Sequence, residues 1–406
     1  MMKEKEMKRV PKLRFPEFTD DWEQRKLSGL CENITVGIAN SATHAYCDKG
    51  VVMFRNQNIK ENTLDDSDII CINEEFEERY KNKRLKENDI LVARTGYPGT
   101  ACVVPKKYEN TQTFTTLIAR PKACLNPYYA SQYMNSESGK AYFTSTQIGG
   151  GQKNSGAGIL ENFPMVLPPN MEEQIKIADY CCNLDHLITL HQRKLKNLNV
   201  LKKCVMQKLF SQKVRFKADD GSEFPKWKEK RLGDVFTERT ERSKGGETLL
   251  SVTIAQGIVR QSETDKRNTA SENKSNYKIV KRNDLAYNTM RMWQGAEGVS
   301  EYDGIVSPAY TVITALDGNN SYFFEILFKQ TFMLQIFQRY SQGLTSDTWN
   351  LKFPTFSEIK CLVPCEDEQN KIVECVTVLD SVIEKQKATL AAWEELKRGL
   401  LQQMFV

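Results

Sequence analysis

The sequence contains one long helical pattern twice, and this duplication constrains the fold more than any other feature. Residues 171–212 carry apolar side chains in alternating steps of four and three, a spacing typical of a coiled-coil seam and not of a β-strand. The same spacing returns 195 residues later, and its interruptions return with it, since His191 and Lys202 correspond to Gln386 and Lys397. Two helices of about 40 residues, each about 60 Å long, are therefore expected.

The charges of the two stretches predict that they pair with each other. Residues 171–213 carry eight basic and four acidic side chains, whereas 366–406 carry five basic and eight acidic ones. Opposite charges beside apolar seams favour a mixed pair over self-pairing. The alternative is two separate helices, each with its own solvated face. For the pair, we expect an interface formed by Ile177, Leu184, Ile188, His191, Leu195, Leu198, Ile372, Leu379, Ile383, Gln386, Leu390 and Trp393.

Each long helix follows a globular segment, and the two segments begin alike. Leu13-Arg14-Phe15 and Trp22 of the first half correspond to Val214-Arg215-Phe216 and Trp227 of the second. Both halves continue with strand-like alternation, an aromatic helix and a polar loop containing glycine. The pattern predicts an α+β fold with two similar mixed α/β domains separated by the two long helices. The expected boundaries are 1–170, 171–213, 214–365 and 366–406.

The boundaries of the finer elements follow from the same alternation. Strands are expected at 51–55, 89–93, 113–120, 248–254, 284–287 and 309–315, and one aromatic helix in each half, at 128–143 and 322–340.

Composition is that of a globular protein with room for two domains. The chain has 406 residues, of which 40% are hydrophobic and 27% charged. No apolar run reaches about 18 residues, and the charged start lacks the apolar core of a secretory signal, so a cytoplasmic protein without a membrane span is expected. The net charge of +5 permits nucleic-acid binding but does not require it.

The cysteines indicate reduced thiols and no structural zinc. The eleven cysteines include no pair with two-residue spacing, and only three histidines are present to complete a zinc site. In a protein that is not secreted, most of these thiols should be reduced and buried in the core.

Two stretches suggest catalysis but fit it poorly. Asn126-Pro127-Tyr128-Tyr129 is similar to the amine-binding motif of amino-methyltransferases, but the second proline is missing, and Asn320 at the matching place favours a capped helix start. The run of glycines at 149–151 precedes Gln152 and Lys153 and lacks the Gly-Lys-Ser/Thr order of a phosphate-binding loop. No catalytic residue and no bound cofactor are expected in this chain.

Polar clusters after the expected strands favour contact with DNA. Arginine reads guanine and asparagine or glutamine reads adenine in the major groove, while exposed amides and lysines suit phosphates. The alternative is ordinary polar strand ends and flexible loops. The candidates are Arg55, Asn56, Asn58, Arg94, Thr95, Tyr97, Gln152, Lys153, Asn154, Asn288, Arg291, Trp293, Gln294, Thr345, Ser346 and Asn350.

The order of these segments resembles the specificity subunit of type I restriction-modification enzymes across nearly the whole chain. The resemblance lies in Leu-Arg-Phe-Pro-Glu-Phe at 13–18, the helix repeated after a proline, and Met-Arg-Met-Trp-Gln-Gly-Ala at 290–296. It implies two target-recognition domains that each read one half of a bipartite DNA site, and an antiparallel coiled coil that spaces them. It also implies two methyltransferase subunits docked on the helices, motor-nuclease subunits joined through them, and S-adenosylmethionine, ATP and Mg on those partners.

An antiparallel pair of equal helices related by a pseudo-twofold axis has its midpoints side by side. His191 and Gln386 should therefore approach each other. Other functions remain open at this point: a specificity subunit of a methyltransferase-only or other defence complex, an enzyme with its own methyltransferase or nuclease activity, or a coiled-coil adaptor that binds no DNA.

Overall fold

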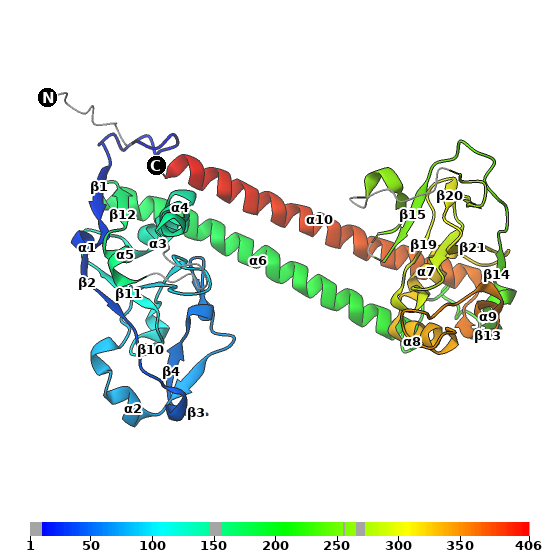
Figure 1. The fold of residues 1–406 in the computed structure, drawn as a ribbon, viewed down its shortest axis with the longest axis horizontal. Coiled ribbons are helices and arrows are strands. Elements are labelled where there is room, and N and C mark those ends of the chain that lie inside the picture. Colours follow the sequence, from blue (N-terminus) through cyan, green and yellow to red (C-terminus); the bar gives the residue numbers. More distant parts are fainter. Residues whose placement is uncertain (1–9, 147–155, 255, 265–272, 406) are drawn as a thin grey trace. The chain divides into compact units, whose positions relative to one another are not determined.

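The computed structural model describes residues 10–146, 156–254, 256–264 and 273–405. Its internal contacts divide the chain into two compact units. Unit 1 comprises Met1–Leu195 with Gln386–Val406, and unit 2 comprises Lys196–Lys385. Each unit contains one globular part and a part of each long helix (Figure 1). Two sheet-rich parts with two long helices confirm the predicted α+β class.

The main sheet has the same strand order in both units. It is four-stranded and antiparallel, with the strand that precedes Arg94 or Arg291 in third place. In unit 1 the order is β2 (Cys31–Val36), β11 (Leu117–Pro121), β8 (Ile90–Val92) and β9 (Ala101–Val103). In unit 2 it is β14 (Phe236–Glu238), β21 (Tyr310–Ala315), β18 (Leu285–Asn288) and β19 (Glu297–Val299).

A second shared element is a strand pair beside the start of each long helix. In unit 1, β1 (Glu23–Lys26) pairs with β12 (Pro164–Leu167), and in unit 2, β13 (Lys228–Arg231) pairs with β22 (Lys360–Val363). The other strands differ between the units. Unit 1 has β3 (Tyr46–Cys47), β4 (Val51–Phe54), β7 (Ile70–Ile72) and β10 (Gln112–Thr113) in one sheet and β5 (Ile59–Lys60) with β6 (Thr63–Leu64), whereas unit 2 has β15 (Leu250–Thr253) with β16 (Gly257–Arg260) and β17 (Lys278–Val280) with β20 (Gly304–Val306).

Three expected elements are interrupted by backbone geometry. The strand expected at 113–120 is split into β10 and β11, and Thr115 between them has a positive φ of 55° that a strand cannot contain. The aromatic helix of each half is also split in two. Ser136 and Gln330 adopt extended backbone angles between the two helices of each pair, and Ser136 Oγ accepts a hydrogen bond from the backbone N of Gly139. The helices are α3 (Pro127–Asn135) and α4 (Glu137–Ser145), and α7 (Ser321–Phe328) and α8 (Thr331–Tyr340).

Asparagine caps begin the first helix of each pair, as the sequence predicts. Asn126 Oδ1 accepts a hydrogen bond from the backbone N of Tyr129, and Asn320 Oδ1 accepts one from that of Tyr322.

The short helices are α1 (Leu27–Leu30), α2 (Glu74–Glu78), α5 (Ala157–Glu161) and α9 (Phe353–Ser357).

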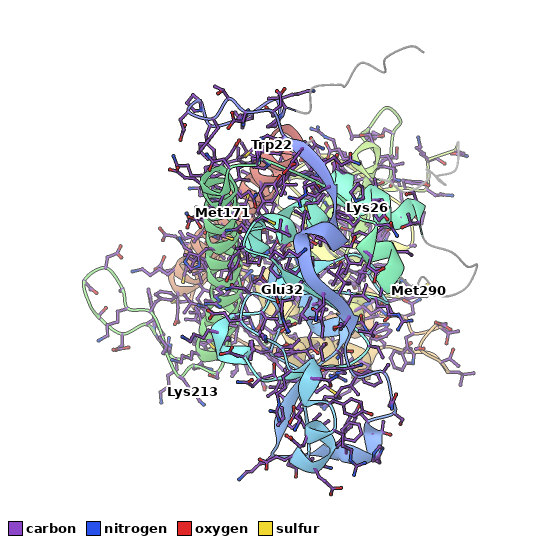
Figure 2. The ribbon with its side chains drawn as sticks, turned by 90° about the vertical axis from the view of Figure 1, so that its left-hand side faces the viewer. Trp22, Lys26, Glu32, Met171, Lys213 and Met290 are labelled. Atoms are coloured by element: carbon purple, nitrogen blue, oxygen red, sulfur yellow. The ribbon has the colours of Figure 1, made fainter. Side chains whose placement is uncertain are left out.

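A buried glutamate attaches the first turn of each long helix to its globular part. In α6 (Met171–Phe210), Glu173 is fully buried and accepts two hydrogen bonds from Arg14, at 2.7 and 2.8 Å, and one from Trp22 Nε1 at 3.2 Å. Trp22 and Met171, the first residue of α6, are labelled in Figure 2.

The same arrangement occurs in unit 2. In α10 (Glu366–Met404), Glu368 accepts hydrogen bonds from Arg215 and from Trp227 Nε1. A buried carboxylate needs a paired cation. The burial of Glu173 therefore depends on Arg14, and that of Glu368 depends on Arg215.

The next residue of each helix makes a second repeated contact. Gln174 and Gln369 are buried, and the side-chain amide of each donates to the carbonyl of the proline before the helix, Pro168 or Pro364, at 3.0 Å. Each Oε1 accepts a hydrogen bond from the backbone N of the asparagine that caps the aromatic helix. The strand pair, the long helix and the aromatic helix are thereby held at one point.

Within each unit, α6 and α10 run antiparallel. In unit 1, Lys397 pairs with Asp185, and Gln386 Nε2 lies 2.8 Å from His191 Nδ1, so the expected approach of His191 and Gln386 is confirmed. In unit 2, Lys202 pairs with Asp380. The two lysines that interrupt the apolar seam are therefore satisfied by an aspartate of the other helix.

The expected interface residues are all buried or half-buried. Ile177 and Ile372 belong to the main cores of units 1 and 2, so the ends of the seam pack into the globular parts. Trp393 lies beside His191, with a ring-centroid distance of 6.2 Å. The buried members are Ile177, Leu184, Ile188, Ile372, Ile383 and Gln386, and the half-buried ones are His191, Leu195, Leu198, Leu379, Leu390 and Trp393.

The thiols are less buried than the sequence suggests. All eleven cysteines are free, but only Cys31, Cys102, Cys181 and Cys361 are buried. No group of three or more His, Cys, Asp or Glu in the described residues could hold a metal ion. Among the helices of the described ranges, none has the length and apolar content to cross a membrane.

The glutamate contact predicts a large and local effect on stability. Arg14→Ala leaves the Glu173 carboxylate buried without its cation and should lower the free energy of unfolding by about 3–5 kcal/mol, measured by urea denaturation. Arg215→Ala should have the same effect in unit 2. Lys12→Ala, at an exposed position two residues before Arg14, should change it by less than about 0.5 kcal/mol. An Arg14 variant as stable as the Lys12 variant would contradict this role of Glu173.

Candidate nucleic-acid interface

In unit 1 the structure brings two of the predicted segments together. Arg55 to Asn58 follow β4, and Arg94 to Tyr97 follow β8. Asn56 joins them, because its Oδ1 accepts hydrogen bonds from the backbone N of Arg94, at 2.6 Å, and of Thr95, at 3.4 Å. Its Nδ2 donates to Thr115 Oγ1 at 3.1 Å. Asn56 is therefore a residue that positions the two segments.

Asn58 requires a correction. It is only 2% exposed, its Oδ1 accepts a hydrogen bond from the backbone N of Arg55, and its Nδ2 donates to the carbonyls of Asp65 and Asp68. All of its amide is used inside the loop, so the expectation that it reaches a base edge is wrong. The sequence alone did not distinguish Asn58 from Asn56, since both lie in one short polar run.

Arg55 is held at the surface by an acidic partner. Its Nη2 donates to the carbonyl and to Oδ2 of Asp68, at 3.0 and 2.9 Å, and its side chain is 28% exposed. Asp68 is the residue that sequence reasoning missed in this loop. Asp68 holds the Arg55 guanidinium in one position. An acceptor on DNA would have to displace Asp68 or bind an N–H group of the guanidinium that Asp68 does not use.

The turn after β8 presents an aromatic side chain. Tyr97 is 84% exposed and stands between Gly96 and Gly99, whose φ angles are +79° and +92°. A Cβ on Gly99 would lie 2.3 Å from the ring of Phe143 in α4, so the turn packs directly on that helix. Arg94 and Thr95 are half-buried at the base of the turn. The candidates Gln152, Lys153 and Asn154 lie outside the described residues.

In unit 2 the predicted segment after β18 folds into a compact turn. Asn288 Oδ1 accepts a hydrogen bond from the backbone N of Met290, and Trp293 Nε1 donates to the carbonyl of Met290 at 3.1 Å. Arg291 is exposed, and its Nη1 donates to Gln294 Oε1 at 3.1 Å. An arginine and a glutamine are thus presented together, a combination that suits the acceptors and donors of base edges.

The polar loop at 342–350 packs beside this turn. Gln342 and Asn350 exchange two backbone hydrogen bonds, of 3.0 and 2.8 Å, and the backbone N of Leu351 donates to the carbonyl of Thr289. Trp349 meets Trp293 edge to face, with ring centroids 5.2 Å apart. Thr345 and Ser346 are exposed, whereas Asn350 is half-buried. The structure therefore joins the two unit 2 segments that the sequence singled out.

The two turns leave equivalent strands that are fixed in the same way. Asp89 before β8 and Asp284 before β18 are buried, and each forms two hydrogen bonds with an arginine on a neighbouring part of the sheet, Arg120 or Arg239. The residue before each aspartate, Asn88 or Asn283, has a φ of 70°. Asp89 and Asp284, like Asn88 and Asn283, follow the same 195-residue offset as the helices, a signal that could have found them in the sequence, whereas Arg120 and Arg239 do not correspond in the repeat.

Glu297, which follows the unit 2 turn in β19, is a titratable group in the buried interior of unit 2. It is fully buried, and neither carboxylate oxygen has a hydrogen-bond partner in the described structure. Burial raises its pKa well above the usual 4.5, and the Lys329 ammonium, 3.8 Å away, lowers it only in part. The group is therefore protonated over a wider pH range in the folded protein than in the unfolded chain.

This pKa gives a pH-dependent prediction. Since the folded pKa of Glu297 is raised, the protein loses stability as the pH rises above about 4.5, the ordinary value. Glu297→Gln is neutral at every pH, so its free energy of unfolding relative to the wild type should increase from pH 5 to pH 8. Urea denaturation across this range measures the difference. Glu301→Gln, at an exposed position, is the control, and parallel pH profiles for Glu297→Gln and the wild type would refute the raised pKa.

Comparison with known proteins identifies a family and two relatives. A family model described as "Type I restriction modification DNA specificity domain" matches residues 19–200 and 225–392. The chain is 27% identical over 230 residues to a putative type I restriction enzyme MjaX specificity subunit of Methanocaldococcus jannaschii. It is 30% identical over 156 residues to the type I restriction enzyme MjaVIII specificity subunit of the same organism. These matches cover 54% and 37% of this chain and 53% and 36% of the relatives, so the chain spans about half of their length or less.

Two solved structures share the fold. A crystal structure of a type I restriction-modification system S subunit from M. genitalium aligns with a TM-score of 0.61 at 16% identity, over 98% of this chain and 99% of that one. A structure from work on complex assembly and conformational transition of the type I R-M system aligns with a TM-score of 0.55 at 14% identity, over 95% and 97% of the two chains. At these identities the likeness concerns the fold.

Proposed function

Because the chain belongs to the family of type I restriction-modification DNA specificity domains, we propose that it is the sequence-specific DNA-binding subunit of a type I restriction-modification complex. The observation that carries the proposal is the repeat: equivalent strands, β8 and β18, end in turns that carry arginine with polar and aromatic side chains. Each unit would read one half of a bipartite double-stranded site. Because the loops of the two units differ, the two half-sites would differ as well.

The proposed reading surfaces are formed by exposed and half-buried members of the candidate set. In unit 1 these are the half-buried Arg55 and the turn with the exposed Tyr97, and in unit 2 they are the exposed Arg291 with the half-buried Gln294 and the loop with Thr345 and Ser346. Arginine and glutamine would contact base edges, and the hydroxyl groups would contact phosphates or bases. The long helices, each of which runs through both units, would set the spacing between the half-sites.

We further propose that the long helices dock two methyltransferase subunits, through which motor-nuclease subunits join. Both helices carry apolar side chains that are at least 40% exposed, a property expected of helices that bind protein partners. Leu201 and Leu396, which correspond in the repeat, are 49% and 47% exposed. The others are Ile175, Tyr180, Leu190, Val200, Val378 and Val382.

Chemistry would be supplied by the partners in the cytoplasm. The family assignment supports a non-catalytic role for this chain, with S-adenosylmethionine on the methyltransferase subunits and ATP and Mg on the motor-nuclease subunits. The same chain could serve a methyltransferase-only complex, and a coiled-coil adaptor that binds no DNA is the alternative that a binding experiment separates.

Arg291→Ala tests the proposal at one half-site. If Arg291 reads a base, its loss should cost about 1–3 kcal/mol of affinity and relax the preference at one position, without changing the other half-site. Binding is measured for the chain with its methyltransferase on DNA libraries randomised at each half. Arg282→Ala, an exposed arginine outside the two loops, is the control. Unchanged affinity and preference would remove Arg291 from the reading surface, and methyl transfer by the chain alone would overturn the non-catalytic role.

A further inference from the structure

The loop at 342–350 carries a leucine at its tip that touches almost nothing in the protein. Leu344 is 101% exposed, the highest value among the large apolar side chains of the described residues. A single exposed leucine on a surface is ordinary when it is partly covered by its neighbours. Complete exposure at the tip of a loop that lies beside the proposed reading turn calls for a partner that covers it.

The loop holds Leu344 in place. The two backbone hydrogen bonds between Gln342 and Asn350 close its base, and Thr345 and Thr348 form further hydrogen bonds across its tip. Gly343 has a φ of 143°, and a Cβ there would lie 2.6 Å from the carbonyl oxygen of Thr348. Only glycine fits this turn, so the sequence itself fixes the presentation of the next residue, Leu344.

The surroundings of Leu344 favour nucleic acid over protein as the partner. Its sequence neighbours Thr345 and Ser346 are polar and exposed, and the adjoining turn presents Arg291 with Gln294. A protein interface centres on a contiguous apolar patch, whereas one apolar side chain among hydrogen-bonding groups is typical of a wedge inserted between stacked bases. The ring of Trp349 in the loop packs edge to face against the ring of Trp293 in the adjoining turn.

We propose that Leu344 is an apolar wedge that enters a base step of the half-site bound by unit 2 and unstacks it. The inference rests on the proposed function, because it requires that unit 2 binds DNA. It adds that this half-site is read partly through its ease of distortion, so that flexible pyrimidine–purine steps are preferred at the position of the wedge.

The test uses the complex of the chain with its methyltransferase on DNA whose half-sites have been mapped. A fluorescent base that brightens on unstacking, 2-aminopurine, replaces one adenine at a time, excluding the methylated adenine. In the wild-type complex, the 2-aminopurine fluorescence should rise at one step of the unit 2 half-site. No fluorescence rise that depends on Leu344 should occur at the other half-site. Leu344→Ala should abolish that rise and weaken binding about tenfold, or about 1.4 kcal/mol, while Leu344→Met should retain both.

Leu362→Ala in β22 is the matched control, because Leu362 is 46% exposed in the same unit but outside the two loops, and it should behave as the wild type. A rise that persists in Leu344→Ala, or normal binding by the wild type without any rise, overturns the wedge and leaves the proposed function intact. Loss of the methyltransferase from the Leu344→Ala complex would instead identify a protein contact and overturn the wedge. Absence of sequence-specific binding by the wild-type complex would overturn both proposals.

Discussion

Two buried carboxylates, Glu173 and Glu368, hold each globular part to its long helix, and the other features of the fold depend on them. Each lies in the first turn of a helix, where an arginine from the start of its own half of the sequence neutralises it and a tryptophan donates a hydrogen bond to it. A buried charge is stable only in a geometry that keeps its partners, because losing one partner costs several kilocalories per mole. The contact therefore fixes the orientation of the sheet on the helix while the loops at the far ends of the strands remain free to differ.

The two units use this freedom differently. Unit 1 connects its candidate segments through one asparagine, Asn56, whereas unit 2 connects them through the ring pair of Trp293 and Trp349. Unit 2 also contains the buried Glu297 after its turn, and the carboxylate oxygens of Glu297 have no hydrogen-bond partner in the described residues. A shared scaffold with different loop interiors is the arrangement expected if the two units bind different surfaces.

The periodic and repeated features could be predicted from the sequence, and the irregular ones could not. The 195-residue offset predicts both long helices and the His191–Gln386 contact, because a helical repeat and its symmetry are properties of the chain alone. The breaks at Thr115, Ser136 and Gln330 lie at single residues with a positive φ or extended backbone angles, which the hydrophobic pattern does not mark. The interior position of Asn58 depends on carbonyls supplied by Asp65 and Asp68. Which polar residues of a loop face outward is decided by such contacts, so the structure turns Asn58 inward, and contact of the other candidates with DNA stays a prediction.

We propose that one chain carries two independent reading units on a common pair of helices. Base-resolution mapping of methylated adenines, in cells that contain this chain with its methyltransferase, tests it most directly. The expected result is a motif with two specified parts separated by unspecified bases of fixed number, and replacement of residues 214–365 with those of a relative should change one part only. A single uninterrupted motif, or a change in both parts, would contradict it.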